Sequence, residues 1–376
     1  MTTRREALAW VGATAGTLRW RSAFADTDFT ASRYAAAVII DALGGPGGED
    51  PSAPDDAPLT AKGLADVAAS GVTAVNVTVN VPGNGPDRYE KAVAGIARME
   101  REIAAHPELF LKVLRASDLA AAKSSHRMGL IFGFQDSSMF DGELERVAEF
   151  YGLGLRICQP TYNLRNLIGD GCMEEADGGL SRLGYQFVDE VNRLRILLDL
   201  SHAGRKTIAQ GIAASKAPMA ITHTGCRALV DLPRNTDDSS LKALADKGGV
   251  AGIYFMPFLR LSGQPHSEDL IRHLEHAVNV CGEDHVGLGT DGGISGIELT
   301  DAYREAVRKD VEQRRKAGVS APGETGDVFT LIPEYNEPRR FLKLADDLVR
   351  RGWTPRRVEK ILGANFARLF GEVWLA

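Results

Sequence analysis

The sequence predicts an α/β fold, a (β/α)8 barrel of the TIM type, and three observations lead to this prediction. Eight apolar runs of strand length recur along the chain, and segments with helical periodicity separate them. No Gly-x-Gly-x-x-Gly sequence follows the first run, which disfavours the competing open, doubly wound sheet with a nucleotide-binding loop. The length of 376 residues suits one barrel-sized domain.

The expected strands lie at about 36–43, 72–79, 128–135, 155–161, 196–201, 218–223, 249–256 and 285–291. Between them lie helical patterns such as LSRLGYQFVDEVNRLR and SEDLIRHLEHAVNVCG. Strands that alternate with helices form right-handed βαβ units with parallel strands, and eight such units close a barrel. Two more helices are expected near 337–350 and 354–370.

Composition indicates an ordinary soluble globular protein. The chain is 44% hydrophobic and 25% charged, with a formal net charge of −6. This balance lacks the bias of disordered chains and of basic nucleic-acid-binding proteins. Because an acidic surface disfavours polyanionic partners, we expect no nucleic-acid ligand.

Four cysteines are present without Cys-x-x-Cys spacing: Cys158, Cys172, Cys226 and Cys281. Their positions support neither a zinc ribbon nor a thioredoxin-like motif, so buried thiols are expected. If the chain is exported, one disulfide among them becomes feasible.

The N-terminus resembles a twin-arginine export signal. In MTTRREALAWVGATAGTLRWRSAFAD, the pair Arg4 and Arg5 precedes a short apolar stretch, and Ala-Phe-Ala ends at Ala25. The sequence therefore predicts an export signal over 1–25, a single mature domain over 26–376, and a periplasmic or secreted location. The apolar stretch is too short to span a membrane, so no integral membrane segment is expected in the mature chain. The alternative is a frayed amphipathic N-terminus.

Polar side chains that end barrel strands are the candidates for chemistry, because active sites lie at that face of the barrel. ILLDLSH ends at His202, PMAITHT contains His223, and HVGLGTD ends at Asp291. The histidines are one βα unit apart, which would place them on adjacent strands. Two imidazoles and a carboxylate at one rim suit a transition metal. The alternative is a pair of hydrogen-bonded structural histidines.

Several motifs together resemble the membrane (renal) dipeptidase family of metallopeptidases: TYNLRNLIGDGCMEEADGGLSRLG, DLSHAG, THTGCRAL, LPRNTDDSSLKALADKGGVAGI and HVGLGTDGG. The resemblance runs from the first strand to about residue 370 and implies an amidohydrolase-type barrel. It also implies two zinc ions bridged by a glutamate. By this resemblance His202 and His223 bind metal, Asp291 orients or protonates the reacting centre, and Arg234 holds a substrate carboxylate. Tyr162 and Asn163 fall at substrate-side positions.

The sequence departs from the family pattern at the first metal. After the first strand, VIIDALGGPG has Leu43 and Gly45 where the family has a His-x-Asp pair. Gln135 stands in place of the bridging glutamate. Tyr162 replaces a histidine, which is a milder change because a phenol can still donate a hydrogen bond to an oxyanion.

Charge then limits the number of ions. Two divalent cations about 3.5–4 Å apart need anionic ligands, and two anions have become Gly45 and Gln135. We therefore expect at most one zinc ion, held by His202 and His223, with Gln135 or Asp291 as a further ligand. Asp41 and Asp136 are the substitutes nearest in sequence.

Three functions stay open. The first is an exported dipeptidase-like metallohydrolase that acts on dipeptides or related small carboxylate-bearing amides, with reduced metal dependence. The second is a catalytically inactive peptide-binding or maturation protein that keeps the dipeptidase fold and pocket. The third is a structural relic of the fold. Each of the first two implies a small peptide or amino-acid-derived ligand. A homodimer also stays open.

Overall fold

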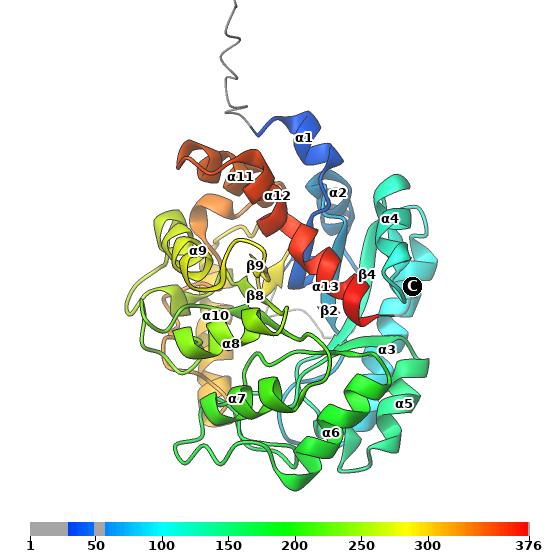
Figure 1. The fold of residues 1–376 in the computed structure, drawn as a ribbon. Helices are drawn as coiled ribbons and strands as arrows, with labels where there is room; N and C mark the ends of the chain where they lie inside the picture. Colours follow the sequence, from blue (N-terminus) through cyan, green and yellow to red (C-terminus); the bar gives the residue numbers. More distant parts are fainter. Residues whose placement is uncertain (1–28, 49–56, 375–376) are drawn as a thin grey trace, which may run out of the picture.

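The structure is a computed structural model that describes residues 29–48 and 57–374. The predicted export signal over 1–25 lies outside the described residues. Figure 1 shows strands at the centre of the molecule and helices around them. In the described part of the chain, no helix combines the length and apolar character needed to cross a bilayer.

The strands pair in parallel ladders within two sheets. One sheet has the order β10-β1-β2-β4-β5-β6 with β3 also paired to β4, and the other has the order β7-β8-β9. The bounds are β1 (Ile40–Gly45), β2 (Ala74–Thr78), β3 (Phe110–Lys112), β4 (Met128–Phe134), β5 (Leu155–Cys158), β6 (Leu197–Leu198), β7 (Ala220–Thr224), β8 (Val250–Ile253), β9 (Val286–Leu288) and β10 (Gly292–Gly293).

Backbone contacts connect the two sheets. A parallel bridge joins Asp199 to Ala220, next to β6 and at the start of β7. On the other side, the Asp291 N–H donates to the Leu43 carbonyl at 2.8 Å, which ties the segment after β9 to β1. The eight predicted strands, now β1, β2 and β4 to β9, therefore follow one another around the TIM-type arrangement that the sequence predicts. The short strands β3 and β10 are additional to it.

The helices alternate with the strands as predicted. They are α1 (Ala31–Ala36), α2 (Ala61–Ser70), α3 (Arg88–Ala105), α4 (Ser117–Ser124), α5 (Glu145–Gly152), α6 (Arg182–Arg193), α7 (Arg205–Ala214), α8 (Asp238–Asp246), α9 (Ser267–Cys281), α10 (Asp301–Lys316), α11 (Arg340–Arg350), α12 (Pro355–Glu359) and α13 (Asn365–Val373). Hydroxyl caps begin several of them: Thr60, Ser181 and Thr300 each accept a backbone N–H from the first turn.

Helix α13 covers the end of the strands opposite the candidate site, and Figure 1 shows it in red, lying across them. Phe366, Leu369 and Phe370 on this helix join an apolar cluster with residues from the strands. The strand residues in that cluster are Ile40, Ala42, Ala74, Ile131, Ile157, Leu197, Ala220 and Val250. Because most of them lie at the N-terminal ends of their strands, the helix closes this end and leaves the C-terminal ends for function.

Candidate active site

The two predicted histidines lie side by side where adjacent strands end. His202 follows β6 and His223 lies in β7; their ring centroids are 4.8 Å apart, and both side chains are buried. Tyr162, from the loop after β5, stacks on His202 with a centroid distance of 4.2 Å. The structure thus brings together three of the residues that the sequence singled out.

Asn163 fixes the orientation of the His202 ring. The Asn163 Nδ2 group donates to the Val319 carbonyl at 2.8 Å, so its Oδ1 faces the histidine as an acceptor. His202 Nδ1 lies 2.7 Å from that oxygen and must carry the proton. His202 Nε2 is then a deprotonated nitrogen, and it is buried without a hydrogen-bond partner among the described residues.

A hydroxyl and a carboxylate fix His223 in the same tautomer. The Thr222 hydroxyl donates to the buried Asp199 carboxylate at 2.6 Å, and its oxygen lies 2.8 Å from His223 Nδ1. Since the hydroxyl proton goes to Asp199, Nδ1 of His223 must be the donor in the second contact. Nε2 of His223 therefore also has a free lone pair, and it too has no partner among the described residues.

The two histidines supply two neutral nitrogen ligands for a metal ion, without a charged third ligand beside them in the described residues. Burial first, and the nearby Arg234 guanidinium second, hold the pKa of both imidazoles well below the usual range, so both rings are neutral at neutral pH. Two neutral imidazoles with free Nε2 atoms are ordinary transition-metal ligands. Within the described residues, however, no group of three or more His, Cys, Asp or Glu side chains has an arrangement that could hold an ion. Asp291 therefore does not complete such a group with the histidines.

The end of β1 contains no metal-binding side chain. Leu43 is buried, and a Cβ added to Gly45 would meet nothing within 4 Å. Gln135 is half-buried and donates its side-chain amide to the Thr78 hydroxyl at 2.8 Å, which leaves only its oxygen for a ligand.

The two carboxylates suggested as substitute ligands are occupied by local hydrogen bonds. Asp41 accepts the N–H and the hydroxyl of Thr290, at 2.7 and 2.6 Å. Asp136 accepts from Asn80, Gly83 and Ser138 at 2.7–2.9 Å. Neither joins the histidines in a three-residue group. The expectation that Asp41 or Asp136 replaces a missing ligand is therefore wrong for this arrangement.

Arg234 presents a buried positive charge to the same site. Its side chain is 5% exposed, and Nη2 has no hydrogen-bond partner in the described structure. The neighbouring Asn235 anchors this loop by donating to the carbonyls of Val230 and Phe258 at 2.8 and 2.9 Å. Arg234 and His202 both line one small pocket. A buried guanidinium with a free N–H group is suited to bind a carboxylate.

Asp291 is the one carboxylate of the predicted set at this face. It adopts a left-handed backbone conformation, with φ 58°, as does His202 with φ 63°. Non-glycine residues rarely adopt this conformation, and such strain concentrates at functional sites. Burial raises the pKa of Asp291 to about 6, although the guanidinium groups of Arg234 and Arg314 oppose this rise. A carboxyl with this pKa can both give and take protons near neutral pH.

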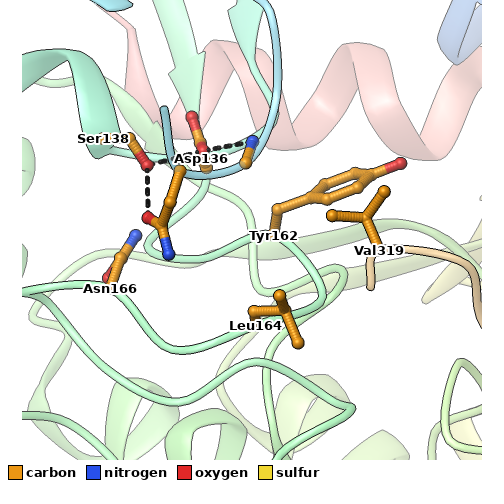
Figure 2. Close-up of a pocket in the computed structure, with 8 residues that line it drawn as sticks. Asp136, Ser138, Tyr162, Leu164, Asn166 and Val319 are labelled. Carbon is orange, nitrogen blue, oxygen red and sulfur yellow. Dashed lines mark hydrogen bonds between the residues drawn. The ribbon is translucent and has the colours of Figure 1, made fainter. Parts of the chain in front are cut away.

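Sequence reasoning missed Arg314, which reaches the site from α10. Its Nη2 atom lies 3.5 Å from the Tyr162 hydroxyl. This arginine follows no strand and lies in none of the family motifs. It is one of many charged residues in a helix without fully buried residues, so the sequence gives no signal for it. A second small pocket lies beside Tyr162. Figure 2 shows Tyr162 and Val319 together on one side of it.

The four cysteines are unpaired in the structure. Cys158, Cys226 and Cys281 are buried, as expected, whereas Cys172 is partly exposed. The Cys172 thiol lies 3.4 Å from Oδ1 of Asn163, next to the candidate site.

Comparison with known proteins identifies the family. A sequence profile of the membrane dipeptidase family, peptidase family M19, matches residues 56–309, more than half of the chain. The chain belongs to this family. The predicted family and the TIM-type fold are thereby confirmed. The characterised relatives in the M19 family are hydrolases, and the family implies a metal cofactor, typically zinc.

Individual proteins are similar to this chain over most of its length. The crystal structure of an amidohydrolase from Pseudomonas aeruginosa is 30% identical, with a TM-score of 0.76, and the match covers 92% of this chain and 98% of that one. An uncharacterized protein from the pqqA 5′ region of Klebsiella pneumoniae is 28% identical over 286 residues, 73% of this chain and 93% of that protein. Dipeptidase verJ from Clonostachys rogersoniana is 31% identical over 251 residues, 66% of this chain but only 56% of that protein.

Proposed function

We propose that this M19 protein is a dipeptidase-like hydrolase of dipeptides or related small amides that carry a carboxylate, with reduced metal dependence. The observation that carries the proposal is the Arg234 guanidinium, which is buried and has an Nη2 atom without a partner in the described residues. A buried guanidinium N–H group without a hydrogen-bond partner is costly unless a ligand supplies one. Its pocket is also lined by His202, so a ligand carboxylate on Arg234 would place an adjacent amide near His202.

Each further residue has a chemical role in this proposal. Tyr162 would donate its hydroxyl proton in a hydrogen bond to the carbonyl oxygen of the substrate amide. Asp291, with its pKa near 6, would exchange a proton with the attacking or leaving group. His202 and His223 would hold one ion through their Nε2 atoms, and the Gln135 oxygen is the proposed uncharged third ligand. When bound, such an ion supplies Lewis-acid polarisation of the amide carbonyl.

Ligand-induced stabilisation tests the role of Arg234. A free-acid dipeptide at about a hundredfold excess over its dissociation constant should stabilise the chain by about 2.7 kcal/mol. The amidated dipeptide should have a much smaller effect, and Arg234→Ala should abolish the difference. Arg227→Ala is the matched control, because Arg227 lies in the same loop but pairs with Asp231. Equal shifts from both ligands in both variants would show that Arg234 is not the carboxylate anchor.

Metal content tests the proposal of at most one zinc ion per chain. After mild chelation and zinc addition, elemental analysis should give one equivalent or less. His202→Ala should remove the bound ion, since two imidazoles are the proposed ligands. A reproducible value near two equivalents would refute the single-ion proposal.

The missing ligands of the first metal favour a second candidate function, that of a catalytically inactive peptide-binding or maturation protein. Leu43 and Gly45 supply no ligand, and Gln135 supplies no charge. Steady-state assays with unblocked dipeptides separate the two candidates. Turnover of the order of 1–1000 per second that disappears in Asp291→Asn supports the hydrolase, whereas Arg234-dependent binding without turnover supports the inactive protein.

We also propose export by the twin-arginine route, with the mature chain beginning near Asp26. Support comes from Arg4 and Arg5 before a short apolar stretch. Replacing both arginines with lysine should trap the precursor in the cytoplasm. Cell fractionation would measure this, and unchanged periplasmic protein would contradict it.

A further inference from the structure

The segment 301–324 lies outside the strand arrangement and returns to the active site. It begins with α10, none of whose side chains is fully buried. Two of its residues contact consecutive residues of the loop after β5. Arg314 reaches the Tyr162 hydroxyl, and the Val319 carbonyl accepts from Asn163. Both contacted residues in turn touch His202.

Glu324 orients the Arg314 guanidinium. Nε and Nη2 of Arg314 donate to the two oxygens of Glu324 at 3.0 and 3.1 Å. The Glu324 side chain is only 9% exposed, against 30% for Arg314. Two parallel bonds of this kind fix the plane of a guanidinium, so Nη2 remains directed to Tyr162.

The contact with Tyr162 has a defined direction. Arginine has donors only, so Arg314 Nη2 donates and the Tyr162 oxygen accepts, at 3.5 Å. The Tyr162 hydroxyl proton consequently stays available for another acceptor. A cation at this oxygen polarises the O–H bond toward donation. Contacts of this length in a ligand-free site commonly shorten when the substrate binds.

We propose that Arg314 is a positioning residue that aims the Tyr162 hydroxyl at the substrate carbonyl and strengthens its hydrogen bond to the developing oxyanion. The inference rests on the proposed function, because it assumes an amide ligand anchored at Arg234. It places a positive charge at the Tyr162 hydroxyl oxygen, supplied by a helix outside the strand arrangement. This is the kind of preorganised donor that stabilises an oxyanion most effectively.

Calorimetric binding of two ligands tests the inference on the full chain. A plain dipeptide measures ground-state binding, and a phosphinate mimic of the same dipeptide carries anionic oxygens where the oxyanion would form. Tyr162→Phe and Arg314→Met should each weaken phosphinate binding by about tenfold or more, while dipeptide binding changes less than about threefold. Because both changes act on the same hydrogen bond, from Tyr162 to the oxyanion, the double variant should lose no more phosphinate affinity than either single variant.

Matched variants separate positioning from folding defects. Arg314→Lys should recover part of the phosphinate preference, since it keeps the charge. Arg314→Met leaves the Glu324 carboxylate without its arginine partner, and adding Glu324→Gln removes that charge. The double change should still behave like Arg314→Met, which would show that the unpaired carboxylate does not cause the loss. Arg308→Met is the control: Arg308 is on the same helix and contacts Asp327 instead of the site.

The outcomes are distinguishable. Equal losses for both ligands in Arg314→Met would mean a structural role only and would overturn the inference, as would an unmodified chain without preference for the phosphinate. Additive losses in the double variant would also overturn it. If dipeptide binding proves independent of Arg234, the proposed function fails and the inference fails with it. If dipeptide binding depends on Arg234 but the preference for the phosphinate is unchanged in Arg314→Met, the inference is refuted and the proposed function stands.

Discussion

At the scale of single residues, Asp41 shows how a buried carboxyl can link stability to pH. It lies in β1 with 1% exposure and holds the backbone and hydroxyl of Thr290, the residue before Asp291. Burial raises the pKa of Asp41 to about 7, although these hydrogen bonds oppose the rise. Between about pH 4 and 7, therefore, Asp41 is protonated in the native chain and ionised in the unfolded chain.

We predict that Asp41→Asn reduces the loss of stability that occurs as the pH rises from about 4 to 7. Since the native state binds more protons in this window, Asp41 lowers the free energy of unfolding by roughly 1.4 kcal/mol per pH unit there. An asparagine can accept from the Thr290 N–H and donate to its hydroxyl, so the contacts survive. Urea unfolding at several pH values measures the difference. A constant difference between the two proteins from pH 4 to 7 would contradict the prediction.

At the scale of elements, the end of β1 explains the missing first metal site. The strand pairs in parallel with β2, with a register shift between Asp41 and Gly44. It also pairs in parallel with β10, where Gly44 and Gly45 lie opposite Gly292 and Gly293. A Cβ on Gly44 would come within 2.6 Å of the Asp41 carboxylate, whereas one on Gly45 would meet open space. The backbone therefore accommodates a side chain at Gly45, where the family has a ligand.

We predict that Leu43→His, Gly45→Asp and Gln135→Glu together raise the zinc content above that of the unmodified chain. The changes restore one imidazole and two carboxylates, and anionic ligands are needed before two cations can share a site. Elemental analysis after zinc addition gives the stoichiometry. Gly44→Asp in place of Gly45→Asp is the control, since it clashes with Asp41. Unchanged zinc content in the triple variant would show that the end of β1 no longer faces the histidines.

Elements also show how far the sequence alone was informative. Apolar periodicity identified the eight strands, and strand-end reasoning placed His202 beside His223, because both depend on local pattern and parallel topology. Strand β3 was missed because three residues beside the first half of β4 carry too little pattern. The role of Arg314 was missed because it depends on a long-range contact, 152 residues from Tyr162 along the chain. The tautomers of the histidines likewise depend on partners that only the folded chain brings together.

At the scale of the whole molecule, α13 contributes to stability at the end of the strands opposite the candidate active site. It packs at the strand ends opposite Arg234 and the histidines, and Phe370 is fully buried against Trp374, with ring centroids 4.2 Å apart. The apolar cluster that closes this end contains none of the described site residues named above.

We predict that Phe370→Ala lowers the free energy of unfolding by about 3–5 kcal/mol, because it removes a buried ring and leaves a cavity. Ligand stabilisation through Arg234 should persist in this variant at a temperature where it is folded. Denaturant unfolding measures the first effect and thermal shift the second. Glu372→Ala on the same helix should change stability by less than about 1 kcal/mol, since it breaks only the exposed pair with Arg368. A comparable loss in both variants would contradict the role of the ring.

The position of Asp291 near the buried Arg234 guanidinium has a calorimetric consequence. Arg234 opposes the rise in the pKa of Asp291, which is nevertheless raised to about 6 by burial. A ligand carboxylate bound to Arg234 offsets that cation, so the pKa of Asp291 should rise further and the complex should take up a fraction of a proton between about pH 6 and 7. The heat of binding should then vary with the ionisation enthalpy of the buffer, and the affinity should fall as the pH rises through this range. Asp291→Asn should remove both effects, and identical heats in all buffers for the unmodified chain would show that binding and protonation are independent.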